Sequence, residues 1–393
     1  MYSDNLKIIT VYLLWIPFLL FLYINLGPYN LGLLDLSSGV AYGGDSGRYL
    51  RAAEQIILGN FPNYPEGVGD INNAQGYMTY NLFLTLLFLL RLDLFSVVIA
   101  QIVLSGIAAL CLFKIGEIVW NKSVGIFAMI LFLFYPSIQI YNFYILTESL
   151  FVNLTIIGFF FLIYNYKLGS IFLGVFILLL ASFVRPFGII IIPTAFIYLF
   201  ILLIKFKKIK LILLFISISI LAFVVTFFII DFLVALLGVP ELLLNGHIIW
   251  NYNILKPPYE VDQSSLNDFN TIKVLSFIIE YPIYFIEVFY NKLYWFFLRA
   301  RPFYSDIHYY FLLISSLIMY IFFVFGFSLN SRRKEVIYLI IIYILGTTFS
   351  VLLTVVDWDA RFSLPILPYI FLIASAGIYK FYLLYIKSIF RLS

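Results

Sequence analysis

Four short polar segments interrupt an otherwise apolar chain, and their side chains are the ones that could carry out chemistry. The first segment centres on Asp45, which lies between the glycines Gly43-Gly44 and Gly47. Glycines permit an irregular backbone that can hold a carboxylate in a fixed direction. Apolar residues recur at helical spacing over residues 49–58, so we expect Asp45 to stand just before a helix. Its carboxylate would then be either a functional group held in a fixed direction or a helix cap.

The second and third segments each place one charged side chain at a turn between very apolar runs. Glu148 follows Thr147, and an unpaired carboxylate in such surroundings is costly to bury. We expect Glu148 either to cap the next helix in contact with water or to face a polar cavity. Arg185 precedes Pro186 in a tight turn. Its guanidinium could extend to the lipid headgroups, or it could present a planar set of donors to a phosphate.

The fourth segment, Asp357-Trp358-Asp359-Ala360-Arg361, carries two carboxylates at a spacing that could hold a divalent metal. Such a triplet is short and common, and the only two histidines, His247 and His308, lie far apart in the sequence. No His, Cys and carboxylate cluster has the spacing of a zinc site, and no phosphate-binding Gly-Lys loop is present. We therefore expect that no cofactor is required, with a divalent metal at the aspartate pair as the open alternative.

The composition indicates what kind of scaffold must position these residues. Of the 393 residues, 64% are hydrophobic and 11% are charged, against about 45–50% and about 25% in soluble domains. This balance excludes a soluble enzyme, a disordered chain and a disulfide scaffold, and the single cysteine, Cys111, cannot form an intramolecular disulfide. The net charge of +4 indicates no nucleic-acid partner. We predict an all-α polytopic membrane protein with one transmembrane domain over residues 1–393 and no separate soluble domain.

A membrane helix needs about 20 mostly apolar residues to cross ~30 Å of hydrocarbon, and this criterion predicts about ten spans. They are expected near residues 8–26, 95–113, 124–141, 149–166, 170–184, 188–204, 211–236, 310–328, 337–356 and 363–385. Two long outer segments, 27–94 and 237–309, connect some of these spans. Within the second, Phe277–Leu298 mixes charged residues with many aromatics, which is typical of a helix lying in the membrane interface. The alternative is that this stretch spans the membrane, which would move the basic residues 332–334 to the outer side.

The orientation follows from the basic residues of the short loops, because cytoplasmic loops carry the excess of Lys and Arg. A cytoplasmic N-terminus places most basic residues inside: Lys7, Lys114, Lys122, Lys167, Lys205, Lys207, Lys208, Lys210, Arg332, Arg333, Lys334, Lys380, Lys387 and Arg391. We therefore expect both termini to be cytoplasmic, in a membrane that is most typically the prokaryotic plasma membrane. Most acidic residues then lie on the outer side, and Asp231 is the main carboxylate within a span. Ion-coupled transporters bury carboxylates near the middle of the membrane. Acidic residues gathered on the outer side therefore favour a site at the outer membrane boundary over a transport path across the membrane.

The segments, taken in order, share a pattern with a known class of enzyme. They read Asp45-Ser46-Gly47-Arg48-Tyr49 with Ala53 and Gly59-Asn60-Phe61-Pro62, then Tyr135-Pro136 and Thr147-Glu148, then Arg185-Pro186, and finally Arg361-Phe362-Ser363-Leu364-Pro365-Ile366-Leu367-Pro368. This order resembles the GT-C class of integral membrane glycosyltransferases, near the protein O-mannosyltransferases and the lipid A aminoarabinose transferases. The chain departs from the class at Ser46, where many relatives have a second acid. We also expect no large soluble C-terminal domain, which some relatives carry.

The resemblance implies a sugar donor on a polyprenyl or dolichyl phosphate, and an acceptor hydroxyl on a lipid, a glycan or a protein at the outer face. It implies an inverting transfer with Asp45 as general base and Glu148 orienting the acceptor or a catalytic arginine. The remaining implied residues bind the donor phosphate (Arg185 and Arg361 first, then Arg48 and Arg301) or the substrates (Tyr49, Tyr135, Asp357 and Asp359). One alternative is an oligosaccharide-lipid polymerase or ligase that uses the loop with Arg299, Arg301 and His308. Others are a lipid-linked sugar flippase or transporter and a structural assembly partner.

Overall fold

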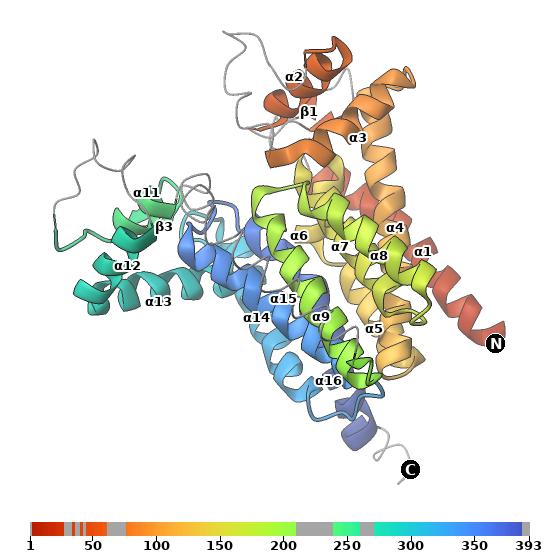
Figure 1. The fold of residues 1–393 in the computed structure, drawn as a ribbon. Helices are drawn as coiled ribbons and strands as arrows, with labels where there is room; N and C mark the ends of the chain where they lie inside the picture. Colours follow the sequence, from red (N-terminus) through yellow and green to blue (C-terminus); the bar gives the residue numbers. More distant parts are fainter. Residues whose placement is uncertain are drawn as a thin grey trace. The chain divides into compact units, whose positions relative to one another are not determined.

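The computed structural model describes residues 2–26, 34–35, 40–41, 45–60, 76–209, 239–259 and 271–386. The expected span 211–236, with Asp231, lies outside the described residues. The chain divides into two compact units. Unit 1 contains Met1–Ile192, Met319–Val336 and Leu367–Ser393, and unit 2 contains Pro193–Ile318 and Ile337–Ile366. Each unit is described by itself below (Figure 1).

Unit 1 is helical apart from one short antiparallel strand pair, β1 (Leu34–Asp35) with β2 (Val40–Ala41). Its helices are α1 (Tyr2–Phe21), α2 (Ser46–Ile57), α3 (Met78–Leu89), α4 (Leu94–Val119), α5 (Lys122–Leu133), α6 (Pro136–Gln139), α7 (Thr147–Ile163), α8 (Leu168–Ser182) and α16 (Leu367–Phe381). Short 3-10 turns follow α6 at Ile140–Phe143 and α8 at Pro186–Ile190.

Unit 2 holds most of α9 (Ile191–Lys205) and α15 (Lys334–Leu353) and the first part of α14 (Asp306–Gly326). It also contains α11 (Val239–Leu244), α12 (Thr271–Glu280), α13 (Pro282–Leu298) and a 3-10 turn at Arg361–Ile366. A second small strand pair joins β3 (His247–Ile249) to β4 (Asn253–Ile254). The two strand pairs are the only departure from the all-α prediction among the described residues.

Six helical segments of the described chain are long and apolar enough to cross a membrane. They are Asn5–Asn25, Leu94–Val119, Pro186–Lys205, Asp306–Gly326, Lys334–Leu353 and Arg361–Tyr385. These segments confirm an integral, polytopic, α-helical membrane protein, but they do not confirm ten spans. At two further expected positions the apolar helices, α7 and α8, are shorter.

The expected span 124–141 is broken in the structure. Helices α5 and α6 meet at an angle of 61°, with Tyr135 between them in an extended conformation and Pro136 at the start of α6. A residue before proline is pushed out of the helical region, and proline is well suited to the first position of a helix. The sequence Tyr135-Pro136 therefore ends one helix and starts the next.

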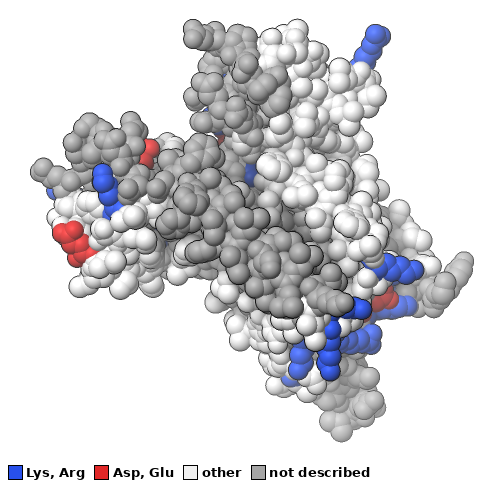
Figure 2. All heavy atoms as spheres, in the orientation of Figure 1, with Lys and Arg blue, Asp and Glu red and all other residues white. Residues whose placement is uncertain are grey.

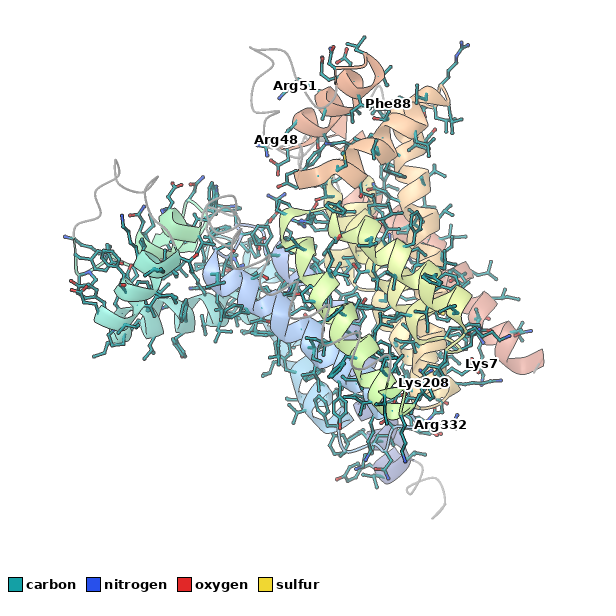
Figure 3. The ribbon with its side chains drawn as sticks, in the orientation of Figure 1. Lys7, Arg48, Arg51, Phe88, Lys208 and Arg332 are labelled. Atoms are coloured by element: carbon teal, nitrogen blue, oxygen red, sulfur yellow. The ribbon has the colours of Figure 1, made fainter. Side chains whose placement is uncertain are left out.

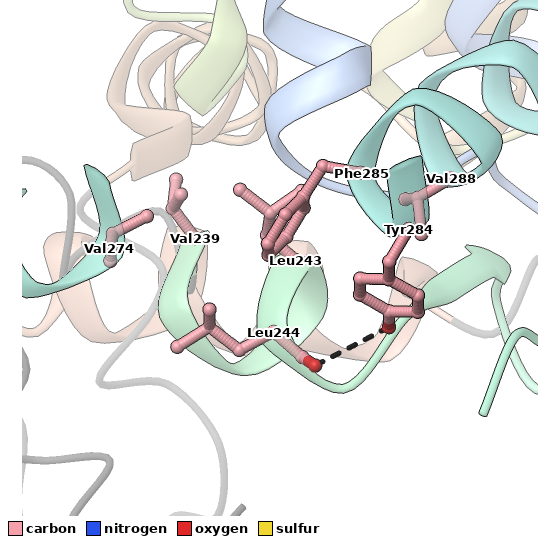
Figure 4. Packing of buried hydrophobic residues seen from close by; sticks show 7 residues of the cluster. All are labelled: Val239, Leu243, Leu244, Val274, Tyr284, Phe285 and Val288. Atoms are coloured by element: carbon pink, nitrogen blue, oxygen red, sulfur yellow. Dashed lines mark hydrogen bonds between the residues drawn. The ribbon is translucent and has the colours of Figure 1, made fainter. Parts of the chain in front are cut away.

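Phe277–Leu298 is likewise not one helix, because Pro282 starts α13 directly after the break at Tyr281. One face of α12 and α13 packs against α11 in unit 2, where Tyr284, Phe285 and Val288 join Leu243 in a buried cluster (Figure 4). Neither helix is among the six candidate spans. The expected interfacial position of this stretch stays a prediction.

The core of unit 1 is formed by α4, α5, α7, α8 and α16, which lie side by side in Figure 1. Helix α16 is buried from Leu367 to Gly377. Glycines allow the other helices to approach closely. A Cβ atom at Gly174 of α8 would lie 2.6 Å from the backbone nitrogen of Leu162 in α7. The α7–α8 contact therefore brings the two backbones together, and it determines where the ends of these helices lie.

The two ends of unit 1 differ in charge. At one end, the backbone N–H of Arg332 donates to the carbonyl of Val119 at 2.8 Å, and the Arg333 guanidinium donates to the carbonyl of Ile163 at 2.6 Å. Figure 3 places Lys7 and Arg332 at this basic end and Arg48 at the opposite end. Most of the described surface in Figure 2 carries no charge, as lipid-facing helices require.

Candidate functional site

Four segments of unit 1 meet at the end opposite the basic residues. They are the start of α2, the residues before α3, the start of α7 and the turn after α8. The Ser46 hydroxyl donates to the carbonyl of Ile145 at 2.9 Å, which joins α2 to the segment before α7. The backbone N–H of Thr79 donates to the carbonyl of Phe183 at 3.1 Å, which joins α3 to the end of α8. These bonds gather the charged residues Asp45, Arg48, Glu148 and Arg185, which we call the carboxylate–arginine cluster.

Asp45 stands directly before α2, as the sequence predicts, and occupies the N-cap position. Its side chain makes no capping hydrogen bond, so the capping alternative is wrong. The carboxylate pairs loosely with Arg48 at 3.8 Å, and both side chains are partly exposed, at 30% and 23%. The positive end of the helix dipole favours a negative charge at this position. Asp45 is thus a partly exposed carboxylate at the start of α2.

Glu148 and Arg185 form a buried ion pair, with 2.9 Å between the guanidinium and the carboxylate oxygen. Their side chains are 1% and 5% exposed, and the guanidinium lies 4.7 Å from the centre of the Phe187 ring. Arg185 therefore does not extend to the lipid headgroups, and Glu148 does not cap α7, whose N-cap is Leu146. The resemblance implied that Glu148 orients a catalytic arginine or the acceptor, but it did not identify Arg185 as the partner. Two lone opposite charges at the same end of consecutive apolar helices were the signal that could have revealed it.

Two tyrosines line the carboxylate–arginine cluster. The rings of Tyr49 and Tyr77 lie 5.1 Å apart. Burial raises the pKa of the Tyr49 hydroxyl, and the neighbouring Tyr77, Glu148 and Asp45 raise it further, whereas Arg185 lowers it. Burial likewise raises the pKa of the Tyr77 hydroxyl. Both phenols therefore stay protonated as hydrogen-bond donors. Tyr77 was missed because it is one of 31 tyrosines with no motif around it.

Tyr135, the other tyrosine expected to contact the substrates, is buried in unit 1. Its ring packs against Phe371 of α16 at 5.0 Å between ring centres. Its position before Pro136 also makes it the residue at which α5 ends and α6 begins.

The aspartates of the fourth segment lie in unit 2, in the turn that follows α15. The Asp357 carboxylate accepts the backbone N–H groups of Arg361 and Phe362, the latter at 2.9 Å. It thereby closes the turn on itself. Asp359 pairs with Arg361 at 3.3 Å.

Two buried arginines support the same turn in unit 2. The Arg301 guanidinium donates to the carbonyls of Trp295 and Asp357, at 2.7 Å and 3.2 Å. Arg299 adopts a left-handed conformation at the end of α13, and its Nε donates to the Ser363 hydroxyl at 2.9 Å. Both side chains are almost fully buried. These three bonds go to groups of the protein itself, whereas the Arg361 side chain is a quarter exposed.

No three His, Cys, Asp or Glu side chains of the described residues lie close enough together to hold a metal ion. At the Asp357–Asp359 pair, both oxygens of Asp357 already accept backbone N–H groups. A metal at this pair would therefore compete with the bonds that close the turn.

The structure thus divides the expected site residues between two clusters. Asp45, Arg48, Tyr49, Glu148 and Arg185 lie together in unit 1, and Arg301, Asp357, Asp359 and Arg361 lie together in unit 2. Comparison of the sequence with protein-family profiles and with characterised proteins finds no match.

Proposed function

We propose that this protein is a membrane glycosyltransferase that moves a sugar from a polyprenyl or dolichyl phosphate to an acceptor hydroxyl, with inversion at the anomeric carbon. The carboxylate–arginine cluster supports this proposal. A partly exposed carboxylate, Asp45, stands beside Arg48 and a buried Glu148–Arg185 pair at one end of an apolar bundle. A donor whose tail lies in the lipid would present its sugar phosphate at the membrane surface, where we place this end of the bundle.

The proposed chemistry assigns different roles to the two carboxylates. Asp45 takes the proton of the acceptor hydroxyl while the acceptor oxygen bonds to the anomeric carbon. The bond from that carbon to the phosphate oxygen breaks, and the lipid phosphate leaves with the electron pair. Glu148 is not accessible to an acceptor in the same way, because its side chain is only 1% exposed and pairs with Arg185. It is a positioning residue that holds Arg185 in place.

Cationic donors would neutralise the charge that develops on the leaving phosphate. In unit 1 the two candidates are Arg48, which is partly exposed, and Arg185, which is nearly buried. Because Arg48 is the more exposed of the two, we assign it the direct contact with the leaving phosphate. Arg185 would contribute its positive charge without touching the phosphate. Within unit 2, Arg361 is partly exposed, whereas Arg301 is fully buried. The scheme needs no metal.

We propose that the carboxylate–arginine cluster faces the extracytoplasmic side of a prokaryotic plasma membrane. The basic end of unit 1, with Lys7 and Arg332, would face the cytoplasm, and both chain termini would be cytoplasmic.

The decisive experiment compares wild-type protein with Asp45→Asn in purified membranes supplied with radiolabelled polyprenyl-phosphate sugars. We expect Asp45→Asn to lower transfer of label by about 10²- to 10⁴-fold, the usual contribution of a general base. Glu117→Gln is the matched control, since its carboxylate pairs with Lys114 near the far end of α4. Full transfer by a folded Asp45→Asn protein would remove Asp45 from the base role. Movement of the lipid without cleavage would indicate a flippase instead.

A second candidate is an oligosaccharide-lipid polymerase or ligase, and one contact in unit 2 favours it. The His308 ring stacks on Tyr304 with 4.4 Å between ring centres, close to the buried Arg299. This candidate predicts that His308→Ala abolishes transfer from a lipid-linked oligosaccharide while Asp45→Asn retains it.

A further inference from the structure

A concave site outside the carboxylate–arginine cluster lies beside α2 and the start of α4. It has a volume of about 690 Å³. Among the described residues it is lined by Leu50, Arg51, Glu54, Ile57, Phe88, Leu92, Asp93 and Leu94. Figure 3 shows Arg51 and Phe88, which line the groove from α2 and α3. We call this site the α2–α4 groove.

The position of the groove relates it to the membrane boundary. Leu94, one of its lining residues, is the first residue of α4, which is long and apolar enough to span a bilayer. If α4 spans the bilayer, a groove at its first residue lies at the boundary between water and hydrocarbon. Helix α4 also carries a stripe of exposed apolar side chains. The stripe consists of Phe95, Ile99, Val103, Ile107 and Leu110, which are each 41–56% exposed and recur every three or four residues.

The lining of the groove is amphipathic. Leu50, Ile57, Phe88 and Leu92 provide an apolar surface, while Arg51 contributes one positive charge, and Glu54 and Asp93 contribute two negative charges. Asp93 caps α4 by accepting the backbone N–H and the hydroxyl of Ser96, at 2.9 Å and 2.6 Å. These bonds lower the pKa of the Asp93 carboxyl. The excess of negative charge favours a ligand that carries a cationic group.

We propose that the α2–α4 groove binds a phospholipid with a phosphate and a primary ammonium in its headgroup, the phosphatidylethanolamine class. The phosphate would pair with Arg51 and the ammonium with Glu54 and Asp93, while an acyl chain follows the exposed stripe of α4. A primary ammonium has three N–H donors for these carboxylates. A quaternary ammonium has none, and Phe88 is the only aromatic residue among those lining the groove. A purely anionic headgroup would leave the carboxylates unpaired.

The test measures lipid retention by the purified protein in detergent, using native mass spectrometry with equal amounts of ethanolamine, choline and glycerol phospholipids. We expect the ethanolamine lipid to be retained in preference to the other two by about two- to fivefold, the size of one exposed charge pair. Glu54→Gln should abolish the preference over the choline lipid. Arg91→Gln is the matched control, because it is exposed on the neighbouring turn and does not line the groove.

A second variant tests whether the lipids bind in the groove at all, independently of the contacts to their headgroups. Leu92→Trp should fill the groove and lower retention of all three lipids without changing any charge. Equal retention of the three lipids by the wild type, or an unchanged preference in Glu54→Gln, would overturn the proposal and indicate ordinary lipid solvation. Because the readout is binding, the result does not depend on glycosyltransferase activity.

Discussion

At the scale of single residues, the two carboxylates of the carboxylate–arginine cluster differ because their surroundings differ. Asp45 is partly exposed and 3.8 Å from Arg48, whereas Glu148 is buried and 2.9 Å from Arg185. An exposed, loose pair contributes little to stability, but removal of one member of a buried pair leaves a charge with poor compensation. Substitutions at the two positions should therefore separate an effect on activity from an effect on stability.

Glu148→Gln should destabilise the folded protein by about 3 kcal/mol, the lower end of the range for a broken buried ion pair. Thermal unfolding in detergent, followed by tryptophan fluorescence, measures the effect. Glu148→Gln combined with Arg185→Gln should cost less than the sum of the single variants, because the pair acts as a unit. Asp45→Asn serves as the control and should change stability by less than about 0.5 kcal/mol. Additive effects of the two substitutions would show that the ion pair does not stabilise the protein.

Lys292 provides a second test at this scale. It is fully buried in α13 and donates to the carbonyls of Leu352 and Thr354. Burial lowers the pKa of its ammonium to about 7. The unfolded chain keeps this proton to a higher pH, so the free energy of unfolding should rise from pH 7 to 9, by at most about 1.4 kcal/mol per pH unit.

The measurement is urea unfolding of unit 2 tryptophans in mild detergent across pH 7–9, in wild type and in Lys292→Met. Lys292→Met should lose the rise in stability with pH. Lys256→Met, which changes an exposed lysine of the same unit, should keep it. The same slope in wild type and Lys292→Met would show that Lys292 stays charged when folded.

The residue-scale predictions from the sequence succeeded where they depended on neighbours in the chain. Asp45 stands before a helix because glycines and helical periodicity are local signals. An arginine partner for Glu148 was one of the two expected roles, but Arg185 was not identified as that partner. The pair depends on how α7 packs on α8, which the sequence does not show directly. The division of the expected arginines between two units was missed for the same reason.

At the scale of elements, the close approach of α7 and α8 determines where Glu148 and Arg185 meet. A Cβ at Gly174 would meet the backbone of Leu162 at 2.6 Å and the carbonyl of Gly158 at 3.0 Å. Backbone atoms cannot move away as a flexible side chain can, so Gly174→Ala should separate the helices. We expect a loss of about 1–3 kcal/mol in the free energy of unfolding.

Gly169→Ala is the matched control on the same helix. Nothing lies within 4 Å of a Cβ at Gly169, so this substitution should leave stability unchanged or raise it slightly. Thermal unfolding of both variants measures the difference. Equal melting temperatures for Gly174→Ala and Gly169→Ala would show that α7 and α8 adjust to the added methyl group at little cost.

The boundaries of the elements were the least predictable part of the fold. Hydropathy located the long helices α4, α14 and α15, because a continuous apolar run is a strong signal. It failed at Pro136 and Pro282, where the apolar composition continues but the backbone breaks. Proline changes the backbone geometry without changing the hydropathy of the segment, so a hydropathy criterion alone does not detect either helix break.

At the scale of the whole molecule, the orientation in the membrane links the charge pattern to the proposed chemistry. Unit 1 carries Lys7 and Arg332 at one end and Arg48 at the other. Lipid-linked sugars for outer-face transfer are presented outside, so the proposal requires the Arg48 end to be extracytoplasmic. The positive-inside rule gives the same orientation independently, because it uses the basic loops and not the candidate site.

Single cysteines can test this orientation in intact cells. The only native cysteine, Cys111, is buried and can be replaced by alanine to remove the background. Leu58→Cys lies at the end of α2, where the native side chain is 63% exposed, and Gly169→Cys lies at the start of α8 with open space around its Cβ. A membrane-impermeant maleimide should label Leu58→Cys in intact cells and Gly169→Cys only after permeabilisation. The opposite pattern would place Asp45 in the cytoplasm, where a donor presented outside cannot reach it, and the proposed transfer would be wrong even if the carboxylate–arginine cluster were intact.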